Sequence, residues 1–418
     1  MQQIAFPAPV RMSHAAHMAD APHNRHFPLF RLKEDATVER LGHLESLPGD
    51  AFKAHLTSTR PNLARCPDGD TFPGLPWYLE DLRPQGFLGR LHAQRHAHQP
   101  GVGLPGDHSP PTTLLKHLAL TGGTGVGDLL PGEPALQAAL AALECPPDHV
   151  QEVDRSRAYP ERAQGLTIGR AITSGPGGEQ PKFTATVAED GQRKAVLVKF
   201  ARAADGAAAE RWADLLVCEH LALQCLRDAG VAACSSHLIQ SRGYTFLELE
   251  RFDRTPVVLG RRGFVSLLSL SKAFVRETTH DWGAAGEHLQ EMGWITADTA
   301  LRMEQLHAFG RLIGNNHMHH GNLGFQLHDH GPLPLAPVYD MLPSSLAPCR
   351  SGALPALAPI PPVAPVPRGS CDPLLWAAPL AMDYWNRVAA SSLLRSKALR
   401  AMAKRNAWRA AAIVQASA

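Results

Sequence analysis

The segment from residue 165 to residue 250 carries the most restrictive pattern in this chain of 418 residues. The runs "GLTIGRAIT" and "SGPGGEQPK" are followed by "FTATVA" and then by "KAVLVKF". In the last run Val196 and Val198 alternate with Leu197 and Lys199, which is typical of a strand with two different faces. The order strand, glycine-rich hairpin, strand, strand predicts a sheet whose hairpin forms a flap over phosphate groups.

Helical patterns dominate the chain beyond this sheet. A helix is predicted from Ala207 to Ala229, with Gly230 as its C-terminal stop, and "YTFLELE" at residues 244–250 alternates as one more strand. "TALRMEQLHAFGRLI", "WAAPLAMDYWNRVAA" and the C-terminus are predicted helices, whereas the proline-rich segment 352–369 is expected to be extended. The sequence therefore predicts an α+β fold.

The part before residue 150 mixes shorter patterns. Residues 1–26 have no periodicity and are expected to form a loose tail. "LFRLKE" near Leu29 alternates as a strand, and "PPTTLLKHLAL" after Ser109 predicts an N-capped helix with proline in its first turn. "GGTGVG" at residues 122–127 follows this helix and not a strand, which argues against a dinucleotide-binding loop.

Composition excludes several classes of protein. A formal net charge of +2 gives no basis for a large nucleic-acid face, so direct DNA binding is not expected. The seven cysteines include no C-x-x-C pair, which argues against a zinc knuckle and a disulfide framework. The sequence shows no signal peptide and no apolar run long enough for a membrane span, so a cytoplasmic protein is expected.

Groups suited to phosphoryl transfer occur along the chain in a meaningful order. Such chemistry on a Mg-nucleotide uses a flap, a lysine for the α- and β-phosphates, an acid that orients the lysine, a catalytic loop and a metal-binding Asp. The candidates are the hairpin 174–178, Lys199, Glu219, the strand-end acid Glu250, the loop 315–322 and Asp340.

The segments that carry these groups resemble the HipA family of serine/threonine kinases, the toxin partners in bacterial toxin–antitoxin pairs. The resemblance rests on "SGPGGEQPKFTA", "LVKF", "LERFDR", "GNNHMHHGN" and "PVYDMLP", and "PWYLEDLRPQGFLGR" is similar to the YjjJ-like branch. It implies a HipA-like, protein-kinase-like fold with two lobes. The expected divisions are an N-terminal subdomain at 27–150, a β-rich nucleotide-binding lobe at 151–255 and an all-helical C-terminal lobe at 256–418.

The same resemblance implies roles for individual residues. The family loop reads G-N-x-D-x-H-x-x-N, and Gly314, Asn315, His319 and Asn322 match it, with His319 holding the loop. Asn322 and Asp340 are then expected to bind Mg²⁺. Within the ATP site, Glu219 is expected to orient the lysine and Glu250 to line the adenine pocket. The residues expected to contact ATP are Gly177, Gly178, Gln180, Lys182, Lys199, Glu219 and Glu250. Family flaps also carry a serine that can be autophosphorylated, and Ser174 lies one residue from its aligned place.

His317 stands where family members carry the catalytic Asp. An imidazole can accept a proton, but it cannot supply the negative charge that orients the substrate hydroxyl. General-base help is worth about 10²–10⁴-fold, so phosphotransfer is expected to be impaired by a factor of that order.

Other interpretations stay open. The chain could be a pseudokinase that binds nucleotide and acts through a partner. The cluster of His317, His319, His320, His328, Asp329 and His330 could instead hold a transition metal in a hydrolase or nuclease, although no H-E-x-x-H motif is present. The resemblance further implies a helix-turn-helix antitoxin partner and a protein substrate, which for similar kinases is an aminoacyl-tRNA synthetase.

Overall fold

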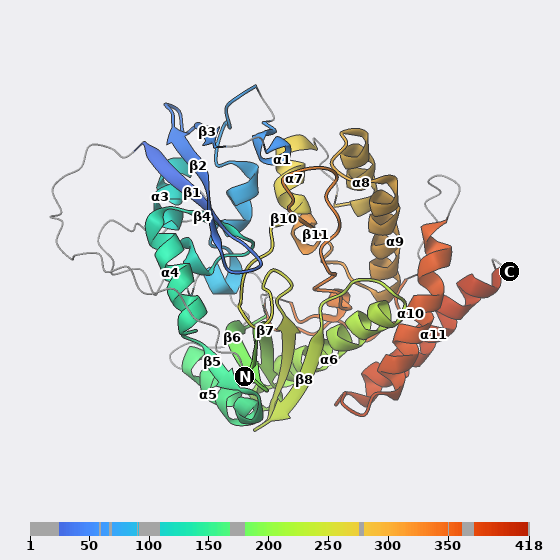
Figure 1. Cartoon of the computed structure of the whole chain (residues 1–418). Helices are drawn as coiled ribbons and strands as arrows, with labels where there is room; N and C mark the ends of the chain where they lie inside the picture. Colours follow the sequence, from blue (N-terminus) through green and yellow to red (C-terminus); the bar gives the residue numbers. More distant parts are fainter. Residues whose placement is uncertain are drawn as a thin grey trace.

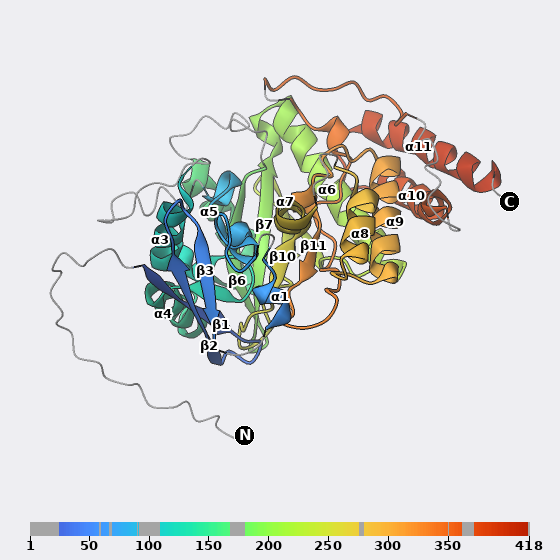
Figure 2. The ribbon, with the colours of Figure 1, turned by 90° about the horizontal axis from the view of Figure 1, so that it is seen from above.

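The computed structural model describes residues 25–57, 60–66, 69–89, 91, 109–167, 180–275, 280–349, 351–361 and 372–416. An N-terminal sheet, a second sheet and a mainly helical region follow one another along the chain (Figure 1). Seen from above, helices α10 and α11 lie at the end of the molecule opposite to strands β1 and β2 (Figure 2).

The N-terminal sheet has the strand order β3-β2-β1-β4, and its neighbours are antiparallel. Alternation in β1 predicts two apolar faces, and Phe30 and Leu32 indeed belong to one core cluster while Leu29 belongs to another. Helices α3 and α4 pack beside this sheet (Figure 1). The bounds are β1 His26–Leu32, β2 Val38–Ser46, β3 Phe52–Leu56, β4 Leu129–Pro131, α1 Pro61–Ala64, α3 Pro111–Thr121 and α4 Glu133–Glu144.

The strand at Leu29 and the helix after Ser109 are confirmed, but the expected cap of that helix is wrong. Pro110 occupies the N-cap position of α3, and no side chain there bonds to the helix. A proline at N-cap and at N1 fixes φ and removes two backbone donors, so the helix start does not depend on a serine cap.

The second sheet has the order β5-β6-β7-β9-β8, in which only the β5–β6 pair of these described strands is parallel. Val196, Val198 and Phe200 face a core cluster with Phe183 and Phe246, as the alternation predicts. Helix α6 covers the opposite face. The bounds are β5 His149–Gln151, β6 Lys182–Glu189, β7 Gln192–Arg202, β8 Ser236–Ser241, β9 Tyr244–Glu250 and α6 Ala207–Asp228, with short 3₁₀ turns η3 Glu152–Asp154 and η4 Ala203–Asp205.

The strand expected at "GLTIGRAIT" begins as a helix instead. Residues 165–167 are the last turn of α5, which runs from Arg155 to Thr167. Tyr159, Ala163 and Leu166 recur at helical spacing and pack against the second sheet. This stripe, and not the alternation after Gly165, decides the structure. The residues of that run beyond Thr167 lie outside the described ranges.

The region from residue 256 onward is helical apart from one two-stranded ribbon. Strand β10 pairs antiparallel with β11, so the expectation of an entirely helical lobe needs this correction. Of the proline-rich segment, residues 353–361 form neither helix nor strand, and Ile360 bonds to Asn406 and Arg409 of α11. The bounds are β10 Phe264–Ser266, β11 Gly324–Gln326, α7 Leu267–Phe274, α8 Trp282–Glu291, α9 Ala297–Ile313, α10 Pro373–Ala390 and α11 Lys397–Ala416.

Aromatic packing joins the N-terminal part to the helical region. The 3₁₀ helix η1 (Trp77–Leu82) places the Trp77 ring centroid 5.2 Å from that of Trp294 and 5.8 Å from that of Phe274. All three side chains are buried or nearly so, and such edge-on aromatic pairs add to the stability that their burial provides.

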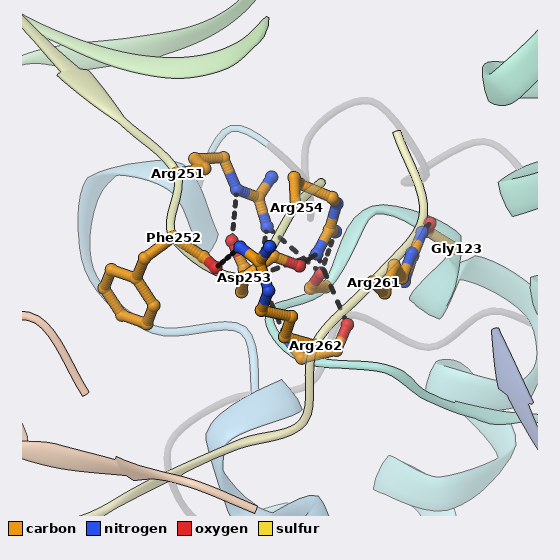
Figure 3. Close-up of polar contacts among 9 residues, drawn as sticks. Gly123, Arg251, Phe252, Asp253, Arg254, Arg261 and Arg262 are labelled. Atoms are coloured by element: carbon orange, nitrogen blue, oxygen red, sulfur yellow. Dashed lines mark hydrogen bonds and ion pairs between the residues drawn. The ribbon is translucent and has the colours of Figure 1, made fainter. Parts of the chain in front are cut away.

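The loop "GGTGVG" makes the second connection, and its role is structural. It begins as the 3₁₀ turn η2 (Gly122–Thr124), and its carbonyl groups accept hydrogen bonds from arginines that follow β9 (Figure 3). Arg254 Nη2 lies 2.7 Å from the Gly125 oxygen, and the Gly127 N–H donates to Asp253 Oδ2 at 2.9 Å. Arg251 and Arg254 both pair with Asp253. The loop therefore ties the N-terminal part to the segment that leaves the second sheet.

Within the described ranges, none of the helices combines the length and apolar character that crossing a bilayer requires.

Candidate functional site

Lys199 brings two acids from distant parts of the chain to one point. It lies on the face of β7 opposite to Val198 and Phe200, and therefore faces α6. Its Nζ is 2.8 Å and 2.9 Å from the two carboxylate oxygens of Glu219 in α6, and it also contacts Oδ1 of Asp340. Lys199 is 5% exposed and Glu219 is 1% exposed, so this ion pair is shielded from water.

The charges of this group stabilise one another. Burial alone would lower the pKa of Lys199, but the carboxylates of Asp340 and Glu219 outweigh burial and raise it. Burial also acts to raise the pKa of Asp340, and the Lys199 charge outweighs it and lowers that pKa. For Glu219, burial dominates and the pKa is raised. The amine therefore stays charged at neutral pH, with an ionised Asp340 beside it.

Asp340 has an unusual backbone conformation. Its φ of 54° lies in the left-handed region, where residues other than glycine are uncommon. Its carbonyl oxygen accepts a hydrogen bond from Asn315 Nδ2 at 3.3 Å. Ser344, at the start of the 3₁₀ turn η6 (Ser344–Leu346), accepts from the backbone N–H of Asn316 at 2.9 Å. These bonds hold Asp340 against the loop that follows α9, and strained residues of this kind concentrate at functional sites.

The loop after α9 is held by its own side chains. It leaves the helix at Gly314, whose φ is 78°, and continues into the 3₁₀ turn η5 (His320–Asn322). His319 caps this turn, because its Nδ1 accepts from the Gly321 N–H at 3.0 Å. Burial and the neighbouring His317 lower the pKa of His319, so a neutral ring suits this role.

His317 projects from the same loop and is exposed. Its ring centroid is 4.5 Å from that of His319. Asn322 Nδ2 donates to the His317 carbonyl oxygen at 2.8 Å and approaches its Nδ1 at 3.4 Å. The Asn322 amide therefore holds both the backbone and the ring of residue 317 at the loop.

Asn322 and Asp340 offer oxygen atoms that fit a hard divalent cation. The buried Asn322 amide uses its nitrogen toward His317, which leaves the carbonyl oxygen as the atom that could bind a metal. The Asp340 side chain is 28% exposed and ionised. Mg²⁺ prefers carboxylate and carbonyl oxygens together with water and phosphate.

Gln180 and Lys182 lie beside Lys199, at the start of β6. Lys182 stands directly opposite Lys199 in the β6–β7 register, and its charge helps to lower the pKa of Asp340. Gln180 donates from Nε2 to the Phe200 carbonyl oxygen. Ser174, Gly177 and Gly178 lie outside the described residues.

Glu250 does not join the charged group around Lys199. It ends β9, is partly buried and pairs with Val196, whereas Leu247 is the residue of β9 that pairs with Lys199. Ser344, whose hydroxyl bonds to the loop, carried no sequence signal, because a serine after a proline is common in turns.

The hypothesis of a histidine metal centre is wrong. Across the part of the chain that the structure describes, no three His, Cys, Asp or Glu side chains gather to hold a metal ion. Asp329 pairs with Arg31 at 2.7 Å and with Arg60, both from the N-terminal part. The buried His320 packs on His280, with ring centroids 5.8 Å apart. The residues of the histidine cluster, although close in sequence, therefore contact different parts of the structure.

Comparisons with known protein families match two parts of the chain. Residues 174–360 match the HipA-like C-terminal domain, and residues 23–140 match the YjjJ-like toxin middle domain. Toxin YjjJ of Escherichia coli (strain K12) is 39% identical over 292 residues, which make up 69% of this chain and 64% of that protein. The chain therefore spans somewhat less than two thirds of this relative.

Two solved structures were among those found in the comparison. A chain of the Shewanella oneidensis MR-1 toxin–antitoxin complex of HipA, HipB and operator DNA matches with a TM-score of 0.50 at 13% identity, covering 93% of this chain and 97% of that one. The Helicobacter pylori proinflammatory kinase CtkA matches with a TM-score of 0.39 at 12% identity, covering 59% of this chain and 94% of that one. The first likeness shows a two-lobed α+β fold of the kinase-like type.

Proposed function

Because the chain belongs to the HipA family, in its YjjJ-like branch, we propose that it is an ATP- and Mg²⁺-dependent serine/threonine protein kinase of a toxin–antitoxin system, with phosphotransfer impaired by His317. The observation that carries this proposal is the contact of Lys199 Nζ with both Glu219 and Asp340. A buried lysine between a helix acid and a metal-binding acid is the arrangement that kinases use to hold the phosphates of ATP.

Each residue has a separate task in this proposal. Glu219 fixes the amine of Lys199, which binds the α- and β-phosphates, and Lys182 adds a second positive charge at the mouth of the site. Asn322 and Asp340 hold Mg²⁺, which neutralises charge on the β- and γ-phosphates. His319 keeps the loop in shape. Gln180, Gly177, Gly178 and Glu250 remain proposed nucleotide contacts.

The reaction itself explains why position 317 matters. The substrate hydroxyl oxygen forms a bond to the γ-phosphorus while the bond to the β,γ-bridging oxygen breaks, ADP leaves, and the hydroxyl proton passes to a base. The Nδ1 of His317 lies 3.4 Å from Asn322 Nδ2, and the imidazole ring offers no negative charge. We therefore expect binding of nucleotide with slow transfer.

A nucleotide titration tests the binding step. ATP should bind to the full chain in the presence of Mg²⁺ and more weakly in its absence. Lys199→Met should reduce the affinity by at least about tenfold, since a charged contact to phosphate is lost. Lys194→Met is the matched control, because Lys194 lies on the same strand with its side chain 40% exposed. Absence of Mg-ATP binding by the unaltered chain would refute the proposal.

Phosphotransfer tests the role of position 317. We expect His317→Asp to raise the initial rate of ATP-dependent protein phosphorylation by about 10²–10⁴-fold. Equal rates in both forms would show that the side chain at 317 is not the limiting feature.

A pseudokinase is the second candidate, favoured by the arrangement of the His317 ring. In that case Mg-ATP would bind and His317→Asp would gain no activity. Under either proposal the partners to look for are a helix-turn-helix antitoxin and a cytoplasmic protein substrate such as an aminoacyl-tRNA synthetase.

A further inference from the structure

A cavity of about 270 Å³ lies beside the catalytic loop. Three parts of the chain line it: the segment 80–85 at the end of η1, the segment 266–272 in and before α7, and the loop residues His319 and Gly321. Helix α7 lies between the N-terminal sheet and helices α8 and α9 in both views (Figures 1 and 2). The cavity is therefore shared by the N-terminal part and the helical region, next to the proposed site of transfer.

The two acids in the cavity wall already bind other groups of the chain. Glu80 forms a two-point pair with Arg83, at 3.0 Å and 3.2 Å. Asp81 accepts hydrogen bonds from the backbone N–H of Ser266 at 2.7 Å and from its hydroxyl at 2.6 Å. Burial raises the pKa of the Asp81 carboxyl group, and the two bonds from Ser266 direct its oxygens into the protein. Both carboxylates therefore already have partners within the chain.

Lys272 is the basic residue of this wall that has no acidic partner among the described residues. It lies in the last turn of α7, is exposed, and forms no ion pair with a residue that the structure describes. The exposed side-chain amide of Gln85 stands in the same wall and can donate hydrogen bonds. A cavity with a free ammonium group, an amide and two engaged carboxylates is suited to an acidic side chain.

We propose that this cavity binds an acidic residue of the protein substrate, close in sequence to the serine or threonine that accepts phosphate, and that Lys272 selects it. This inference rests on the proposed kinase function, because only a protein kinase would have a protein substrate at this site. The volume of the cavity suits one side chain of an extended peptide, and His319 in its wall neighbours His317, where the acceptor hydroxyl must come. Lys272 is thus a specificity-determining residue.

A peptide array tests this selection. Immobilised peptides with a central serine carry either Asp and Glu or Lys and Arg at single flanking positions, and the labelled full chain is applied with a non-hydrolysable ATP analogue and Mg²⁺. We expect the acidic peptides to capture the unaltered chain roughly fivefold better at one or two positions, as a partly exposed ion pair allows. Lys272→Glu should reverse the preference, and Lys272→Gln should abolish it.

Lys404→Glu is the control, because it makes the same charge change at an exposed position of α11 that does not line the cavity. Circular dichroism shows whether the Lys272→Glu variant is folded. If that variant is not folded, the peptide preference of Lys272→Gln tests the proposal instead. Capture without preference, capture of neither class, or an acidic preference that survives Lys272→Gln would overturn the proposal. A nucleotide titration on the same samples reports separately on the kinase proposal, so the two can fail independently.

Discussion

Replacing Lys199 with methionine should destabilise the folded protein even without nucleotide. Methionine keeps much of the apolar stem but removes the amine that lies 2.8 Å and 2.9 Å from the Glu219 oxygens. Glu219 is 1% exposed, so its carboxylate cannot regain the lost interaction from water. Removing one member of a buried ion pair costs about 3–5 kcal/mol, because the other charge is left buried and alone.

The pH dependence of this cost follows from Glu219. Burial already raises its pKa, and loss of the Lys199 charge raises it further. A carboxyl group whose pKa is higher in the folded than in the unfolded state destabilises the fold increasingly as pH rises above its unfolded value of about 4.3. The deficit of Lys199→Met should therefore be small near pH 5 and reach its full size by pH 8.

Urea unfolding followed by circular dichroism measures the deficit. Each 1.4 kcal/mol changes the ratio of folded to unfolded protein about tenfold, so the expected loss lowers that ratio by roughly 10²–10⁴. The double variant Lys199→Met, Glu219→Gln should recover at least about half of the loss, because no buried charge is left over. Lys194→Met should change the free energy of unfolding by less than about 0.5 kcal/mol. If Lys199→Met unfolds like the unaltered chain at pH 8, the ion pair is not buried as described.

Three further perturbations test other parts of the structure. Asp253→Asn should lower the free energy of unfolding by about 3–5 kcal/mol in urea, because Arg251 and Arg254 lose the carboxylate that they share; a change under about 1 kcal/mol would contradict this. Burial lowers the pKa of His220 to about 4, so the protein should lose stability as pH falls from 6.5 toward 4. His220→Gln should reduce this loss by about 1–2 kcal/mol, measured as the difference between thermal melts at pH 4.5 and pH 7.5. Asp329→Asn should lower the melting temperature without changing its response to Zn²⁺, and a Zn²⁺-dependent shift lost in this variant would restore the metal hypothesis.

Local patterns predicted the elements that have a regular period of apolar residues. The strands β6, β7 and β9 have residues that alternate between two faces, and in β9 both faces are buried, Tyr244 and Phe246 in one core cluster and Leu247 and Leu249 in another. The helices α6 and α9 have long apolar stripes. Helix α5 was missed because its apolar stripe is short and interrupted by Pro160. The ribbon of β10 and β11 joins segments about sixty residues apart, and three-residue strands have no periodicity to detect.

The candidate site, too, could be predicted only in part from the sequence. Residue order and family resemblance singled out Lys199, Glu219 and Asp340, but no local pattern can show that their side chains meet. Their contact depends on the register of β7 and on the left-handed backbone at Asp340. The histidine cluster failed for the opposite reason, since residues adjacent in sequence separate when the chain turns at η5 and β11.

The bonds that hold residue 317 make its substitution a clean test of chemistry. The backbone N–H of His317 donates to Asn315 Oδ1 at 3.0 Å and to Ser344 Oγ at 3.1 Å, and its carbonyl oxygen accepts from Asn322 at 2.8 Å. None of these three bonds uses the imidazole. Its ring makes a longer contact with Asn322 Nδ2, at 3.4 Å, and lies edge-on to the His319 ring, and the side chain is exposed, so we expect an aspartate to leave the three backbone bonds in place. His317→Asp should therefore melt within a few degrees of the unaltered chain. A gain in phosphotransfer would then report on the base itself, and a large loss of stability would mean that the ring supports the loop.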